Sequence, residues 1–167
     1  MTQNASAKNL WQGSEAEGNF VTDLSLNNSV IKFGHLDWNN DNELLEAQKA
    51  ENFKNLYVAG NYSGDNGQLH MNVVLGKDDS ATDKMIIGGD TSGTTYINFK
   101  NIGGSGAQTA QGIKVIEVLG NSDGNFIKSN PLVGGLYEYS LVKGGNQGTE
   151  SDWYLTSLSL IHISEPT

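Results

Sequence analysis

Three acidic residues, Asp78, Asp79 and Asp83, flank the short segment 80–82. A pair of carboxylates is the minimum equipment of a glycoside hydrolase, in which one acid protonates the leaving group and the other acts as base or nucleophile. The segment 76–83 nevertheless has the composition of a polar turn between two strands, where such acids cap or solvate a loop. We therefore interpret these acids as structural, and we expect no catalytic residue in this chain.

The three histidines, His35, His70 and His162, do not lie at the spacing of a metal-binding pair. His70 falls within an alternating apolar pattern, so its side chain is expected on the solvent face of a strand. The run Gly88-Gly89-Asp90 resembles one copy of a calcium-binding β-roll repeat, but such sites need stacked copies to complete their coordination. We expect neither a metal nor a cofactor.

Other features of the sequence argue against phosphate chemistry and nucleic acid. The glycine run 103–106 does not match the dinucleotide-binding motif, and the chain has no nucleophile elbow of the GxSxG type. The net charge is −9, and all ten cationic side chains are lysine. Arginine is the side chain best suited to phosphate and guanine edges, so an acidic, arginine-free chain is a poor partner for nucleic acid or an anionic membrane.

The absence of cysteine excludes disulfides, thiolate metal sites and cysteine catalysis. It suits a chain that crosses a membrane unfolded, and it suits equally a small bacterial domain that simply lacks the residue. The chain has no apolar run near the roughly 18 residues that span a bilayer. Residues 1–13 show no apolar core of a signal peptide, so any export signal is expected to lie outside this chain, and this segment is not expected to insert into a membrane.

The apolar residues occur in short bursts that are separated by Gly, Asn, Asp and Ser. Strict alternation at Leu69, Met71, Val73 and Leu75 is typical of a half-buried strand. Strands are expected at 20–21, 24–26, 30–33, 56–58, 69–75, 85–87, 95–99, 113–118, 136–141 and 153–155. Their uneven spacing favours an all-β solenoid whose coils carry loops of variable length.

The segment 42–52 interrupts this strand pattern. It contains residues that favour a short helix, with Asp41 or Asn42 as its N-cap, and it could equally form a loop. The sequence leaves both possibilities open.

Aromatic side chains gather near the C-terminal end, at Tyr137, Tyr139, Trp153 and Tyr154. They could form a carbohydrate-binding platform, but large rings also close the end of a hydrophobic core, and we favour the second interpretation. The residues expected to carry this structural role are Gly134, Gly135, Tyr137, Tyr139, Trp153 and Leu155. We call these six residues the C-terminal cap.

Several segments in a fixed order carry a family resemblance. They are Asn61-Tyr62-Ser63-Gly64, the run from Thr82 to Gly89, the run from Gly103 to Thr109, the run from Gln111 to Ile116, and the closing strands. With these segments, residues 53–157 resemble the pertactin-like C-terminal region, or autochaperone region, of a bacterial autotransporter passenger. Met85 stands where leucine is more usual. Residues 1–52 are similar only to generic upstream β-helix rungs.

The resemblance implies a right-handed parallel β-helix whose C-terminal rungs act as a folding nucleus. It also implies a non-enzymatic, adhesin-like passenger stem of type V secretion, located at the bacterial surface or secreted after cleavage. The implied partners are an outer-membrane β-barrel of the same protein, absent from this chain, and a host-surface protein or glycan. The role in virulence would belong to that whole protein.

Two alternatives from other functional classes stay open. One is a β-helix polysaccharide-active enzyme, which the scattered acids and the lack of arginine disfavour. The other is a carbohydrate-binding module that uses the aromatic end. The final segment, 158–167, resembles translated adaptor sequence, and we expect it to be non-native.

Overall fold

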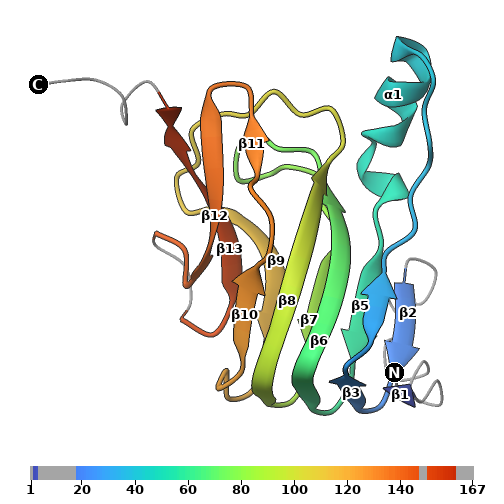
Figure 1. The fold of residues 1–167 in the computed structure, drawn as a ribbon, viewed down its shortest axis with the longest axis vertical. Coiled ribbons are helices and arrows are strands. Elements are labelled where there is room, and N and C mark those ends of the chain that lie inside the picture. Colours follow the sequence, from blue (N-terminus) through green and yellow to red (C-terminus); the bar gives the residue numbers. More distant parts are fainter. Residues whose placement is uncertain (1, 4–17, 147–149, 161–167) are drawn as a thin grey trace, which may run out of the picture.

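The structure is a computed structural model in which residues 2–3, 18–146 and 150–160 are described. These residues form two β-sheets and one short α-helix (Figure 1). The elements are β1 (Thr2–Gln3), β2 (Gly18–Val21), β3 (Leu24–Asn27), β4 (Val30–Lys32), α1 (Asp41–Ala47), the 3-10 helix η2 (Ala50–Asn52), β5 (Asn55–Val58), β6 (Tyr62–Val73), β7 (Lys84–Ile87), β8 (Thr91–Asn101), β9 (Ile113–Val118), β10 (Asn125–Lys128), β11 (Val133–Gly134), β12 (Tyr137–Lys143) and β13 (Trp153–Ser159).

From β5 to β10 the chain alternates between the two sheets. One sheet has the order β1-β3-β6-β8-β10, with β4 also on β6, and the other has the order β11-β12-β13-β9-β7-β5-β2. Neighbouring strands in the middle of each sheet are parallel, whereas β1 on β3 and the pairs among β11, β12, β13 and β9 are antiparallel. The all-β prediction is confirmed. The finer prediction of a right-handed parallel β-helix stays a prediction, because both sheets are mixed.

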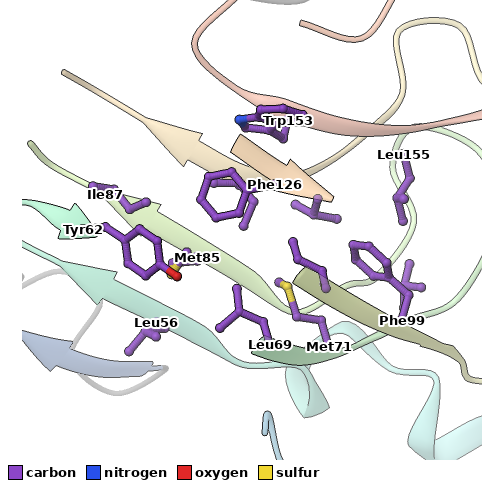
Figure 2. Close-up of a cluster of buried hydrophobic side chains, with 14 of the residues drawn as sticks. Leu56, Tyr62, Leu69, Met71, Met85, Ile87, Phe99, Phe126, Trp153 and Leu155 are labelled. Atoms are coloured by element: carbon purple, nitrogen blue, oxygen red, sulfur yellow. The ribbon is translucent and has the colours of Figure 1, made fainter. Parts of the chain in front are cut away.

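The hydrophobic core lies between the two sheets. In β3 and β7 alternate residues are buried, as the period of two requires, and many core residues have no exposed surface. Leu69 and Met71 come from β6 in one sheet, and Met85 comes from β7 in the other (Figure 2). Burial of this apolar surface is the main force that holds the two sheets together.

A smaller hydrophobic cluster lies beside α1 and contains Ala47, Phe53 and Ile102. The helix forms because the side chain of Asn40 accepts the backbone N–H of Glu43, while the Glu43 carboxylate accepts the N–H of Asn39. The segment that the sequence left open is thus helical from Asp41, and its N-cap is Asn40 rather than Asp41 or Asn42. The helices of the described residues are all too short or too polar to span a membrane.

Candidate functional site

The C-terminal cap is built on a hairpin that extends one sheet. β12 and β13 pair antiparallel, with Tyr139 opposite Ser157 and Leu141 opposite Leu155. β13 in turn pairs with β9, and Trp153 lies opposite Ile116. The hairpin therefore covers the edge of β9 that would otherwise remain open for another strand.

Three cap residues are buried in the core. Tyr139 and Leu155 have no exposed surface, and Trp153 is 6% exposed. The Trp153 ring meets the edge of Phe126 at 5.6 Å between centroids, and Phe126 in turn stacks on Tyr62 at 5.8 Å (Figure 2). These contacts place the rings inside the protein, where they cannot form an exposed platform for a sugar.

The Tyr139 hydroxyl group joins three separate segments. It accepts the backbone N–H of Ala107 at 3.0 Å and lies 2.7 Å from the Gly76 carbonyl oxygen, to which it donates. Burial raises the pKa of Tyr139, and the Ala107 hydrogen bond opposes that effect only in part. The phenol therefore stays protonated at neutral pH and keeps its role as donor.

The two glycines of the cap allow a close approach between backbones. Gly134 is buried, and a Cβ atom there would lie 3.0 Å from both the Gly106 nitrogen and the Leu75 Cβ. Gly135 has a φ of +56°, and a Cβ atom there would overlap the Ser105 carbonyl oxygen. The loop that contains Gly106 thus packs directly on the glycine pair, so a larger residue at either position would push the loop away.

Tyr137 is the one cap aromatic that the structure leaves half-buried. It pairs with Gly134 on one side and with Ser159 on the other, and its ring packs against the margin of the core. Of the six predicted cap residues, Tyr139, Trp153 and Leu155 thus meet in the core, while the glycines and Tyr137 lie at its rim. Their role as a folding nucleus stays a prediction.

Sequence reasoning missed a polar clip at the same end of the molecule. The Thr109 N–H donates to the Ser157 hydroxyl oxygen at 2.8 Å, and the Ser157 N–H donates to the Thr109 hydroxyl oxygen at 2.9 Å. Both residues are buried, so this reciprocal pair is shielded from water. The two residues are 48 positions apart, and nothing in their local sequence signals the contact.

Comparison with known proteins decides the family. A family model described as Autochaperone Domain Type 1 matches residues 19–141, from β2 into β12.

The chain belongs to the autochaperone family of autotransporters.

Curated relatives agree with this assignment. The chain is 53% identical over 104 residues to the protein YdeU of Escherichia coli K12, covering 61% of this chain and 22% of YdeU. It is 42% identical over 126 residues to the adhesin BmaC autotransporter of Brucella suis biovar 1 (strain 1330), covering 70% of this chain and 4% of BmaC. It is 43% identical over 109 residues to the autotransporter adhesin AIDA-I of Escherichia coli, covering 64% of this chain and 8% of AIDA-I. The chain thus spans less than a quarter of the length of each of these relatives.

In this autochaperone domain Asp78 is a structural acid of an unexpected kind. Its carboxylate accepts the backbone N–H groups of Ala110, Gln111 and Gly112 at 3.0, 2.9 and 3.1 Å. Burial raises its pKa, but the three hydrogen bonds outweigh burial and the pKa is lowered. Asp78 thus fixes a distant loop, 110–112, rather than only capping its own turn.

Asp83 serves a different segment, so the acids do not form a catalytic pair. It has no exposed surface, and it accepts the N–H of Lys54 at 2.9 Å and both the N–H and the side-chain amide of Asn72 at 2.7 and 2.8 Å. Burial is the largest effect on its pKa and raises it. Asp79 is exposed. The expectation that these acids cap or solvate their own loop does not hold for Asp83, which is buried and accepts hydrogen bonds from Lys54 and Asn72.

The other residues with possible chemistry lie apart from one another. His70 is half-buried between β4 and β8 rather than fully on the solvent face. Gly88 and Gly89 lie against the backbone of the preceding turn, at Ala59 and Gly60. Within the described ranges no three His, Asp or Glu side chains gather closely enough to hold a metal ion. His162 lies outside those ranges.

The predicted non-native segment, 158–167, begins inside β13. Leu158 pairs with Glu138, and Ser159 pairs with Tyr137. Residues 161–167 lie outside the described residues, and the origin of the whole segment stays a prediction.

Proposed function

We propose that this autochaperone region folds first within a longer passenger and serves as a template for the coils that precede it. In this proposal residues 53–157 form the templating region and residues 1–52 are upstream coils. The role is structural and non-enzymatic. It places the chain in the stem of a passenger that is exposed at the bacterial cell surface or released after cleavage.

The observation that carries the proposal is the difference between the two ends of the sheets. At the C-terminal end the hairpin β12–β13 covers β9, with Trp153 buried in the core and Tyr139 both buried and hydrogen-bonded. At the other end, among the residues that the structure describes, β2 is the last strand of its sheet and β4 pairs with β6 alone. An open strand edge presents N–H and C=O groups that can pair with a new strand, so β2 and β4 can receive strands of a preceding coil.

We also propose that the parallel middle of the two sheets continues as a right-handed parallel β-helix. Strands β5, β7 and β9 pair in parallel in one sheet, and β6, β8 and β10 do so in the other. Each crossing between sheets is part of a β-to-β connection, and such connections are right-handed in nearly all proteins. The antiparallel hairpin then ends the helix.

The longer protein is proposed to include an outer-membrane β-barrel that follows this region. The relatives BmaC and AIDA-I are named as autotransporter adhesins, which supports an adhesin-like passenger here. Contact with a host-surface protein or a glycan is assigned to parts of the passenger outside this chain. The buried positions of Tyr139 and Trp153 support this choice over a carbohydrate-binding end.

The test is the order in which amide groups become protected during refolding. Pulse-labelling hydrogen exchange on the 167-residue chain is expected to protect amides of β9, β12 and β13 before those of β2, β3 and β4. The variant Tyr139→Phe should delay the protection of amides in all six strands. Val30→Ala, in β4, should delay the protection only of the amides in β2, β3 and β4. Simultaneous protection, or earlier protection of β2 to β4, would contradict templating from the C-terminal end.

A further inference from the structure

Four turns of the molecule place an aspartate or asparagine at equivalent positions. Asp23, Asn61, Asp90 and Asn121 each come directly before a residue that pairs across the same sheet. Those following residues are in register, since Leu24 pairs with Tyr62, Tyr62 pairs with Thr91, and Thr91 forms a bridge with Ser122. The four residues therefore stack one above another along the molecule, and we call them the Asx ladder.

Each step of the Asx ladder is a hydrogen bond from a backbone amide to the side chain of the preceding turn. The N–H of Asn61 donates to Asp23 Oδ1 at 2.8 Å, that of Asp90 to Asn61 Oδ1 at 2.9 Å, and that of Asn121 to Asp90 Oδ1 at 2.8 Å.

A backbone bond runs in the opposite direction at every step. The N–H groups of Leu24, Tyr62 and Thr91 donate to the carbonyl oxygens of Asn61, Asp90 and Asn121. Two opposed hydrogen bonds fix the relative position of two turns, so the ladder sets the register between coils.

Glycines beside the ladder bring the turns into contact. Gly60, Gly89 and Gly120 come directly before three of the ladder residues, and a Cβ atom on any of them would overlap the backbone or ladder side chain of the preceding turn. Turns packed this closely suit a short side chain whose oxygen reaches the next backbone amide, which describes aspartate and asparagine. The spacing along the chain varies, at 38, 29 and 31 residues, while the hydrogen bond stays the same.

The Asx ladder is unfinished at its N-terminal step. Among the described residues, no side chain accepts the N–H of Asp23 in the way that Asp23, Asn61 and Asp90 accept the three later amides. In the described part of the chain, the strand on the adjoining edge is β1, whose two residues pair with Leu24 and Ser25. At the spacing of the other steps, the missing acceptor belongs 29 to 38 residues before Asp23, upstream of Met1.

We propose that a preceding β-coil docks here and supplies an aspartate or asparagine side chain that accepts the Asp23 N–H. The inference rests on the proposed templating function and identifies the partner's chemistry and register. Docking replaces the short antiparallel β1 with a parallel strand on β3 and β4, and adds another on β2. The ladder then selects one register among the several that sheet pairing alone would allow.

A first experiment measures the ladder in the chain as it stands. Asn61→Ala removes the acceptor of the Asp90 N–H. The Asp90 amide is therefore expected to exchange about tenfold faster in the native state of this variant. Asn61→Asp keeps the acceptor and should leave that rate near the parent value. Asp123→Ala removes an exposed acid two residues after Asn121 of the ladder and serves as the matched control. Unchanged exchange at Asp90 in Asn61→Ala would overturn the ladder.

A second experiment tests the docking step. A copy of residues 53–76 fused before Met1 places the copied Asn61 38 residues ahead of Asp23, which equals the native distance from Asp23 to Asn61. The Asp23 amide is expected to exchange about tenfold more slowly in this fusion, and alanine at the copied Asn61 should abolish that gain.

The outcomes of the fusion separate the two proposals. Protection of β2 and β4 amides without protection of Asp23 overturns the ladder inference and leaves templating intact. Absence of any new protection at β2, β4 and Asp23 overturns both. Protection of all three that survives alanine at the copied Asn61 shows docking that does not depend on the ladder, and it also overturns the inference.

Discussion

The two ends of this molecule differ in how their strand edges are covered. At the C-terminal end, β13 pairs with β9, and Tyr139, Trp153 and Leu155 are buried beneath the hairpin. At the N-terminal end, Val30 on β4 is 42% exposed, and β2 is the last strand of its sheet among the described residues. The hairpin thus covers β9 at the C-terminal end, whereas β2 and β4 at the other end have no further strand beside them within the described residues.

The difference teaches where stability is concentrated. A buried aromatic ring contributes several kcal/mol to the free energy of unfolding, whereas a half-exposed valine contributes little. A nucleus must be stable before its neighbours arrive, so it needs contacts that are complete within itself. Tyr139, Trp153 and Leu155 of the C-terminal cap are buried, whereas Val30 at the other end is 42% exposed, and the cap's role as a nucleus stays a prediction.

Truncation of the Trp153 side chain is the strongest test of the difference in stability between the two ends. Trp153→Ala removes a ring that is 6% exposed and is expected to cost about 3–5 kcal/mol of unfolding free energy, because it leaves a cavity beside Phe126. Urea denaturation followed by circular dichroism measures the loss. Val30→Ala should change stability by no more than about 0.5 kcal/mol. Equal losses in the two variants would remove the distinction between the ends.

A glycine pair provides the next largest effect. Gly135→Ala forces a side chain into a φ of +56° and against the Ser105 carbonyl oxygen, with an expected cost of about 2–3 kcal/mol. At Gly34 a Cβ atom would have no other atom within 4 Å, so Gly34→Ala should be neutral or stabilising by up to about 1 kcal/mol. Thermal unfolding of both variants compares the packed loop with the open one. A neutral Gly135→Ala would show that the 105–106 loop can move aside.

Removing one oxygen atom tests the polar part of the cap. Tyr139→Phe keeps the ring but leaves the Ala107 N–H and the Gly76 carbonyl without their partner, at an expected cost of about 1–2 kcal/mol. Tyr137→Phe on the same strand is the matched control, since Tyr137 is only half-buried. Chemical denaturation of both proteins gives the comparison. A cost no larger than that of Tyr137→Phe would limit Tyr139 to apolar packing.

The smallest expected effect depends on pH and concerns Asp78. Because hydrogen bonds from the 110–112 loop lower its pKa in the folded state, ionised Asp78 adds stability above the usual carboxyl pKa, and this stability is lost as the pH falls through the lowered value. Asp78→Asn should therefore destabilise the protein at pH 7, and the difference from the parent should shrink below about pH 4. Stability curves against pH measure this difference, with the exposed Asp79→Asn as control. A constant difference at all pH values would contradict the charge-based account.

Local pattern was enough to locate most of the strands. The bursts at 20–21, 24–26, 56–58, 85–87 and 113–118 fall on β2, β3, β5, β7 and β9. The strand predicted at 69–75 is the second half of β6, which begins at Tyr62, and β8 likewise begins before its apolar burst. The missing halves are rich in Gly, Ser and Thr, so only pairing with neighbouring strands makes them extended. The short strands β10 and β11 were not predicted, because four and two residues carry too little periodicity.

The candidate site likewise has a part that the sequence predicted and a part that it did not. Aromatic residues and paired glycines near the C-terminal end were sufficient to nominate the cap, and the structure brings Tyr139, Trp153 and Leu155 together in the core. The clip between Thr109 and Ser157, the reach of Asp78 to residues 110–112 and the Asx ladder escaped prediction. Each is a hydrogen bond between residues 29 to 48 positions apart, and single polar side chains in turns carry no signal of such distant partners.

The sequence by itself determined that this chain is β-rich and rich in turns, because alternation, β-branched residues and glycine act through local backbone preferences. It also determined the acidic charge and the absence of thiol chemistry, which are properties of composition. Only the tertiary structure decided which strands are neighbours, which end is closed, and which acids are buried. Those outcomes depend on contacts between residues far apart in the chain, where burial and hydrogen-bond satisfaction are settled jointly by both partners.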